Sequence, residues 1–343
     1  MTYSLLMQRY GNASEALRAV PELAKRGGKT LKPASRAAAE AELGMNADLG
    51  ATLLFKGSEG YPLRLAQFDD SPPVISARGA LHLFDRPAVA VVGARNASIK
   101  AQRLAQKLAE DLTDNGYVVV SGLARGIDAA AHNGALAGGT IAVIAGGIDI
   151  QYPPENAVLH DSIAEAGLLL AEMPPSTKPS PRHFPIRNRI ISSLSLGVVV
   201  VEAAQRSGSL ITAREGAERG GEVMAVPGSP LDPRAEGCNY LIREGATLVR
   251  HVEDIIDCLS QPAITALPTP QDWREARLTP GPQIAIDRSR TVILEALGAE
   301  ASEIDDVIRW CDAPTSTVLA AILELELAGR ISRHHGNRIC RIF

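Results

Sequence analysis

The 343-residue sequence has few cysteines and no long apolar run. Its four cysteines form no CxxC pair, and its seven histidines form no HExxH motif, so we expect neither disulfides nor a structural metal. No apolar segment approaches the length of a membrane span, and residues 1–10 lack the basic-then-apolar pattern of a secretory signal. These absences predict a cytoplasmic protein without membrane contact.

An excess of positive charge is also missing. The formal net charge is −4, so a nucleic-acid partner would have to be held by a local basic surface rather than by bulk charge. At this length we expect two or three domains, one of them large. Changes in residue pattern predict a small helical domain (SAM or helix-hairpin-helix-like) at 1–58, a sheet domain at 59–261, a proline-rich linker at 262–286 and a winged-helix domain at 287–343.

The sheet domain is predicted from six β-branched or leucine-rich runs, each followed by a glycine-containing turn and a helical segment. Strands that alternate with helices specify a doubly wound, mostly parallel, Rossmann-like α/β sheet. Ligands of such sheets bind at the carboxyl ends of the strands. The runs are 89–92, 118–120, 141–144, 168–170, 198–201 and 223–226.

Ser121 to Asp128 (Ser-Gly-Leu-Ala-Arg-Gly-Ile-Asp) follows the second run and precedes an alanine-rich helix. Gly122 and Gly126 can take positive φ, Arg125 supplies a fixed charge, and Asp128 can cap a helix whose free N–H groups face an anion. The segment therefore predicts a phosphate cradle. The alternative is that it is an ordinary glycine-containing turn between a strand and a helix, without a bound ligand.

Other unusual residues follow the remaining runs and should meet on the same rim. Glycines, hydroxyls and arginines are concentrated there, which suits an anionic ligand. We expect this rim to bind through Gly93, Arg95, Ser121, Gly122, Arg125, Gly126, Gly146, Gly147, Arg187, Asn188, Arg189, Ser207, Gly208 and Ser209.

Arg187 and Arg189 lie two residues apart at the predicted start of a helix. In a first turn both side chains can reach one crevice, where paired arginines suit phosphates and bases. The alternative is that they tie a loop to Glu172 or Glu202.

Enzyme signatures are largely missing from these loops. The first loop is not GxGxxG, no GxxxxGK[ST] occurs, and Ser121-Gly122 stands where an acidic ribose partner is expected. Asp128 and His132 have the i, i+4 spacing of an acid–base pair, but a structural role is favoured. We therefore expect no catalytic residues and no cofactor. The alternative is a nucleotide- or nucleoside-phosphate-processing Rossmann-fold enzyme.

The tail follows the order helix, helix, helix and basic hairpin, which is the winged helix-turn-helix pattern. The third helix carries Glu324 and Glu326, which would repel phosphates. The hairpin is therefore the more plausible contact surface, for duplex DNA or for protein. Its basic residues are Arg330, Arg333, His334, His335, Arg338 and Arg341.

Six motifs in order resemble the DNA-processing protein A family (DprA, also called Smf). The resemblance covers residues from about Tyr61 to Leu259. The motifs are Val89 to Arg95, Ser121 to Asp128 with His132, Phe184 to Arg189, Ser207 to Ala213, Val226 to Gly228 and Gly237 to Ala246.

This resemblance implies a non-catalytic mediator that binds single-stranded DNA and hands it to the recombinase RecA during natural transformation. It implies a DNA crevice formed by Arg95, the loop 121–126 and the turn 187–189, and a homodimer surface near Leu241 and Ile242. The first loop departs from the family's Gly-Ser-Arg, because Ala94 replaces the serine and removes a hydroxyl. Aromatic residues make up only 4% of the chain, so Phe184, Tyr152 and Tyr240 are the few candidates for stacking.

Overall fold

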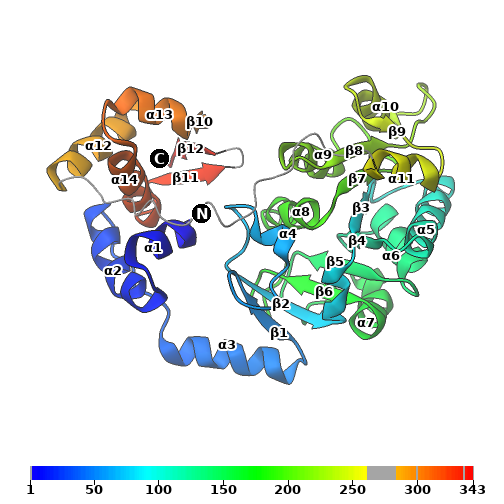
Figure 1. The fold of residues 1–343 in the computed structure, drawn as a ribbon, viewed down its shortest axis with the longest axis horizontal. Helices are drawn as coiled ribbons and strands as arrows, with labels where there is room; N and C mark the ends of the chain where they lie inside the picture. The colour runs from blue at the N-terminus through cyan, green and yellow to red at the C-terminus, as the bar shows by residue number, and fades with distance from the viewer. Residues whose placement is uncertain (1, 261–282, 299, 335–336, 343) are drawn as a thin grey trace. The chain divides into compact units, whose positions relative to one another are not determined.

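The structure, a computed structural model, describes residues 2–260, 283–298, 300–334 and 337–342 (Figure 1). It divides into two compact units. One comprises the described residues of Met1–Ala38 and Pro268–Phe343, and the other those of Ala39–Leu267. Within the described ranges, no helix is long and apolar enough to cross a membrane.

The larger unit contains a nine-stranded sheet in the order β1-β2-β6-β5-β4-β3-β7-β8-β9. The strands from β6 to β9 in this order are parallel, whereas β2 is antiparallel to β6 and β1 to β2. This confirms the predicted mostly parallel α/β fold. The strands are β1 (Thr52–Phe55), β2 (Val74–Gly79), β3 (Ala88–Val92), β4 (Val118–Ser121), β5 (Thr140–Ile144), β6 (Leu168–Ala171), β7 (Gly197–Val200), β8 (Glu222–Ala225) and β9 (Thr247–Leu248).

All six predicted strands are present as β3 to β8, each within one residue of its predicted ends. Three strands were not predicted. β1 and β2 mix exposed and buried positions, and β9 has only two residues, so none of them forms a buried apolar run. Because β1 already pairs with β2, the sheet begins before the boundary expected at residue 59.

Helices cover both faces of the sheet, as alternation along the buried strands requires. One face packs against α4 (Leu63–Ala66), α8 (His183–Leu194), α9 (Ser209–Glu218) and α10 (Glu236–Arg243). The other packs against α5 (Ile99–Asp114), α6 (Ile127–Ala135), α7 (Ala157–Ala166) and α11 (Val252–Ser260). Short 3₁₀ turns lie at Leu81–Asp85 and Pro154–Asn156.

The smaller unit has the predicted winged-helix elements together with N-terminal helices. Three helices precede a β-hairpin, and a two-residue strand completes a three-stranded sheet in the order β10-β12-β11. The elements are α1 (Thr2–Tyr10), α2 (Ala13–Arg26), α12 (Gln283–Ala296), β10 (Ser302–Glu303), α13 (Ile304–Cys311), α14 (Thr315–Leu327), β11 (Ile331–His334) and β12 (Arg338–Arg341). Helix α3 (Arg36–Asp48) runs across the division between the units.

Two tail predictions need correction. The linker expected at 262–286 ends in helix, since α12 starts at Gln283, and its residues up to 282 lie outside the described residues. The hairpin is not uniformly available for contact: Arg333 pairs with Glu326 at 3.4 Å, and Arg341 Nη1 donates to the Leu294 carbonyl at 2.7 Å. His335 lies outside the described residues.

Candidate nucleic-acid interface

The strand order brings four loops of the sequence together. β3 lies between β4 and β7, so the chain leaves β3 toward one side of the sheet and later returns to its other side. Such a reversal leaves a crevice at the carboxyl ends of the strands. The loops after β3, β4, β5 and β7 meet there, and residues of α8 complete the lining.

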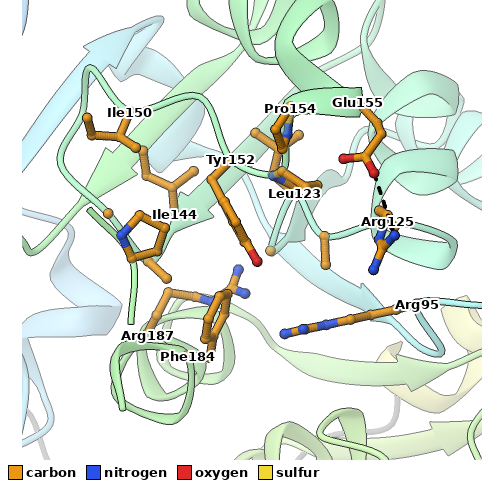
Figure 2. A pocket seen from close by; sticks show the side chains of 16 residues that line it. Arg95, Leu123, Arg125, Ile144, Ile150, Tyr152, Pro154, Glu155, Phe184 and Arg187 are labelled. Atoms are coloured by element: carbon orange, nitrogen blue, oxygen red, sulfur yellow. Dashed lines mark ion pairs between the residues drawn. The ribbon is translucent and has the colours of Figure 1, made fainter. Parts of the chain in front are cut away.

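This crevice consists of two cavities, of about 160 Å³ and about 300 Å³, which share Arg95, Ala124, Phe184 and Arg187 as lining residues. Figure 2 shows the first cavity, where the side chains of Arg95, Phe184 and Arg187 lie close together. Ten predicted site residues line one or both cavities: Gly93, Arg95, Gly122, Arg125, Gly146, Arg187, Asn188, Ser207, Gly208 and Ser209.

Arg187 forms the floor of the crevice. Its side chain is buried, and its Nη1 donates to the Val143 carbonyl of β5 at 2.6 Å. A Cβ on Gly122 would lie 1.9 Å from this nitrogen, so the glycine is required because the guanidinium lies against bare backbone. Burial lowers the pKa of Arg187 to about 10, a change that nearby Asp128 opposes, so the group stays cationic at neutral pH.

Asp128 holds the loop after β4. Its carboxylate accepts hydrogen bonds from the backbone N–H groups of Gly122 at 3.2 Å and Ala124 at 3.4 Å. Burial raises its pKa, and the charge of Arg187 opposes that rise.

This arrangement corrects the predicted phosphate cradle. The two amides bond to the protein's own carboxylate rather than facing an anion, and Asp128 does not cap the helix start. Gly126 takes the predicted positive φ of 76°, but in place of Gly122 it is Leu123 that adopts the left-handed region, with φ of 53°. The crevice therefore offers a buried guanidinium instead of an open ring of N–H groups.

Arg95 lies over an aromatic ring at the mouth of the crevice. Its guanidinium carbon is 4.8 Å from the centroid of Phe184, a cation–π distance. Tyr152 packs beside Phe184 with ring centroids 5.9 Å apart, and both rings line the first cavity. Within the described residues, Arg95 forms an ion pair with no carboxylate, so its charge is available to a ligand.

Arg125 is a second exposed cation at the same rim. It lies 3.5 Å from Glu155, and both side chains are 59% exposed. Solvent screens such a pair strongly, so a phosphate can compete for the guanidinium at little cost.

Arg189 does not enter the crevice, which corrects the prediction that the two arginines act together. Its Nη2 lies 2.5 Å from Glu172, and it lines neither cavity. The loop-tying alternative holds for Arg189, whereas Arg187 alone faces the site. Side chains two positions apart in a helix point to different faces, so Arg187 and Arg189 have different neighbours.

Three further predicted residues are structural. Ser121 is fully buried, and its hydroxyl donates to the Val91 carbonyl at 2.7 Å. A Cβ on Gly126 would meet the Ala94 carbonyl oxygen at 2.3 Å, and one on Gly147 would meet that of Pro174 at 2.5 Å. These glycines permit loops to pack against one another and line neither cavity.

The possible acid–base residues are also engaged within the fold. His132 is fully buried with Nδ1 2.7 Å from the Thr140 hydroxyl, and burial lowers its pKa to about 3. Glu202 accepts hydrogen bonds from the backbone N–H of Ser98 at 2.9 Å and from its hydroxyl at 2.7 Å. It therefore fixes the start of α5.

Several lining residues were not predicted from the sequence. Thr212 lines the second cavity one turn after Ser209 in α9, and Ala124 lines both cavities. Helical spacing from Ser209 could have identified Thr212. Ala124 carries no polar side chain and was expected at the crevice only as part of the loop 121–126 that the family resemblance implies.

The predicted dimer residues lie elsewhere. Leu241 and Ile242 of α10 are partly buried against the core of their own chain. Tyr240 is 53% exposed and, with Leu241, lines another groove, which shares Ser207 and Ile211 with the crevice, but Tyr240 itself lines neither of the two crevice cavities. Tyr240 is therefore not a stacking residue of this site.

Comparison with known proteins shows the family of this chain. Residues 52–260 match the family described as DNA recombination-mediator protein A, residues 277–337 match the DprA winged helix domain, and residues 1–44 match the DprA-like N-terminal HHH domain. The DNA processing protein DprA of Streptococcus pneumoniae is 46% identical over 198 residues, which are 57% of this chain and 70% of that protein. Protein Smf of Escherichia coli K12 is 40% identical over 285 residues, which are 82% of this chain and 75% of that protein.

Solved structures give the same result. The crystal structure of the Streptococcus pneumoniae protein superposes with a TM-score of 0.61 at 36% identity, covering 75% of this chain and 97% of that one. A Helicobacter pylori DNA processing protein A, described by its single-stranded DNA binding mode, superposes with a TM-score of 0.56 at 30% identity, covering 61% and 95%. By sequence and by fold, this chain belongs to the DNA recombination-mediator protein A family.

Proposed function

We propose that this protein binds single-stranded DNA in the crevice and delivers it to the recombinase RecA during DNA uptake, without catalysis. One observation carries the proposal: Arg95, paired with no carboxylate among the described residues, lies 4.8 Å from the Phe184 ring centroid above the buried Arg187. Cations that hold phosphates beside an aromatic ring that stacks on bases are the usual means of binding single strands. The single-stranded DNA binding named for the Helicobacter pylori relative supports the same assignment.

Several features favour binding over turnover. Asp128 is held by two loop amides, and His132 is fully buried against Thr140. His132 is therefore not placed to exchange a proton with a ligand in the crevice, and the carboxylate of Asp128, which lines the second cavity, is engaged by the two amides. A nucleotide-processing enzyme would instead show a large thermal shift with micromolar nucleoside monophosphate or NAD, because a specific ligand stabilises the folded state by mass action.

The primary test compares fluorescence anisotropy of labelled single- and double-stranded oligonucleotides across a range of salt concentrations. We expect tighter binding of the single strand and a salt-dependent affinity. Replacing Arg95 with Gln should lower the salt slope by about 0.7, the value for one phosphate contact on a single strand. Arg103, an exposed arginine on α5 outside both cavities, provides the matched Arg103→Gln control. Equal affinity for both strands, or a flat salt dependence, contradicts the proposal.

The RecA step rests on family membership and needs its own assay. RecA hydrolyses ATP once it assembles on DNA, so its ATPase activity on single strands already coated by a single-strand-binding protein reports loading. We expect the wild-type chain to raise this activity and Arg95→Gln to lose part of the effect. If the chain binds single strands yet leaves RecA activity unchanged, the loading role is wrong while DNA binding stands.

The proposal includes a homodimer formed through α10. Leu241 lines a groove together with the exposed Tyr240, and this groove adjoins the DNA crevice at Ser207 and Ile211. Sedimentation at increasing protein concentration should show dimers, and Leu241→Glu should shift the protein to monomers with unchanged circular dichroism. A wild-type protein that stays monomeric at every concentration would exclude the dimer.

A further inference from the structure

The third helix of the winged helix, α14, is exposed only at its first residue, Thr315. Every residue from Ser316 to Ala328 is buried or partly buried. A winged-helix protein that reads duplex DNA places this helix in the major groove, which requires an exposed face. A helix covered all round is instead a core or docking element.

The core of the winged helix covers only part of α14. Val318, Ala321 and Ile322 belong to the apolar cluster formed with α12, α13 and the hairpin. Glu324, also fully buried, is paired with Arg290 of α12. These contacts account for one side of the helix.

The chain's own N-terminal helices cover the rest. Helices α1 and α2 both contact α14, as Figure 1 shows within this unit. Leu5 and Arg9 of α1 face Leu319 and Leu323 of α14 across a cavity of only about 30 Å³. Leu323 is 2% exposed although it is not part of the apolar cluster above, so its cover comes from the N-terminal side.

Gly27, at the end of α2, lies directly against the backbone of α14. Its φ of −73° and ψ of −4° are ordinary helical values, so the backbone there does not require glycine. A Cβ at this position, however, would lie 2.2 Å from the Glu324 carbonyl oxygen and 2.5 Å from the Ala328 Cβ. The glycine is therefore explained by its contact with α14.

We propose that α14 is the docking surface for the N-terminal helices α1 and α2, so that the two ends of the chain form one folded unit. The side of α14 that a DNA-reading winged helix would present is occupied by Leu5, Arg9 and the end of α2. Any DNA or protein partner of this unit must then bind away from α14.

The test uses the full chain with Leu323→Cys as a reporter. Alkylation followed by peptide mass spectrometry measures its reactivity beside two native thiols: part-exposed Cys311, and buried Cys340, which reports on the winged-helix core. We expect the new thiol to react slowly, like Cys340. Adding Gly27→Leu, at a C-cap whose helical backbone angles leucine can adopt, should raise its rate at least about tenfold by undocking the helices, while Cys340 stays slow.

Gly44→Leu is the matched control, because a Cβ at Gly44 meets nothing within 4 Å. It should leave the reactivity of residue 323 unchanged. The proposal is overturned if the new thiol reacts as fast as Cys311 when Gly27 is intact, or if Gly27→Leu leaves its rate unchanged. Faster reaction of Cys340 as well would show that the whole winged-helix core is lost. That result would also contradict the proposal, which requires α1 and α2 to leave α14 while this core stays folded.

Discussion

Gly122 and Arg187 are in direct contact: a Cβ on residue 122 would fall 1.9 Å from Nη1 of the arginine. The pair joins the loop after β4 to the first turns of α8. It keeps a cation at the floor of the crevice, where its hydrogen bond to Val143 fixes its position. The proposed DNA site therefore depends on a glycine that need not touch DNA.

Gly122→Ala should displace the Arg187 guanidinium and weaken single-stranded DNA binding by about tenfold, equivalent to about 1.4 kcal/mol. Gly208→Ala is the control, since Gly208 lines the same crevice but a Cβ there meets nothing within 4 Å. Anisotropy titrations of both variants check the prediction. Equal losses in the two would mean that the Gly122–Arg187 contact is not what matters.

Phe184→Leu should remove a stacking surface and weaken binding by about 1–3 kcal/mol, with little change in the salt slope. The phosphate contacts remain, so the loss should persist at high salt. Phe55, a 45% exposed residue of β1 outside the crevice, allows the matched change Phe55→Leu. A shallower salt dependence in Phe184→Leu would indicate that the ring acts by positioning Arg95 for a phosphate contact instead.

Arg189→Ala should destabilise the sheet unit by about 3 kcal/mol, because it leaves the largely buried Glu172 without its partner. Single-stranded DNA affinity should be unchanged where the protein is folded. Arg250→Ala breaks a pair with Asp254 in which the arginine is 64% and the aspartate 14% exposed, and should cost about 1 kcal/mol because solvent still screens the guanidinium. Urea unfolding measures both. A clear loss of single-stranded DNA affinity in the folded Arg189→Ala variant would show that Arg189 takes part in DNA binding.

His132 should make the protein less stable in mild acid. Its folded pKa of about 3 lies below the unfolded value of about 6.5, so the unfolded chain binds more protons between these limits. The free energy of unfolding should therefore fall as pH drops below about 6.5, by up to about 1.4 kcal/mol per pH unit from this group.

Comparing the wild type with His132→Gln isolates the effect of this histidine. Glutamine retains a polar group near Thr140 and does not titrate. The difference in unfolding free energy between the two proteins should shrink or reverse as the pH falls from 7 to 5. A difference that stays constant over this range would show that His132 is not buried in its neutral form.

The sequence by itself determined the layout of the large unit. Val118 to Val120 and the other buried runs can only be strands covered on both faces, and the helical segments between them make parallel pairing the natural solution. The winged-helix order could likewise be predicted from helical periodicity and the final hairpin. Both predictions depend on the spacing of apolar residues over short segments, and this spacing can be read from one sequence.

Only the tertiary structure decided what each rim residue does. Arg187 and Arg189 are the same residue type two positions apart, but one faces Gly122 and the other faces Glu172. Likewise, Asp128 takes up the loop amides that seemed free for phosphate, and Gly27 proves to contact Glu324 nearly three hundred residues away. Each of these roles depends on which residue, distant in the sequence, packs against the side chain in the folded protein. The spacing of residues along the sequence does not identify that neighbour.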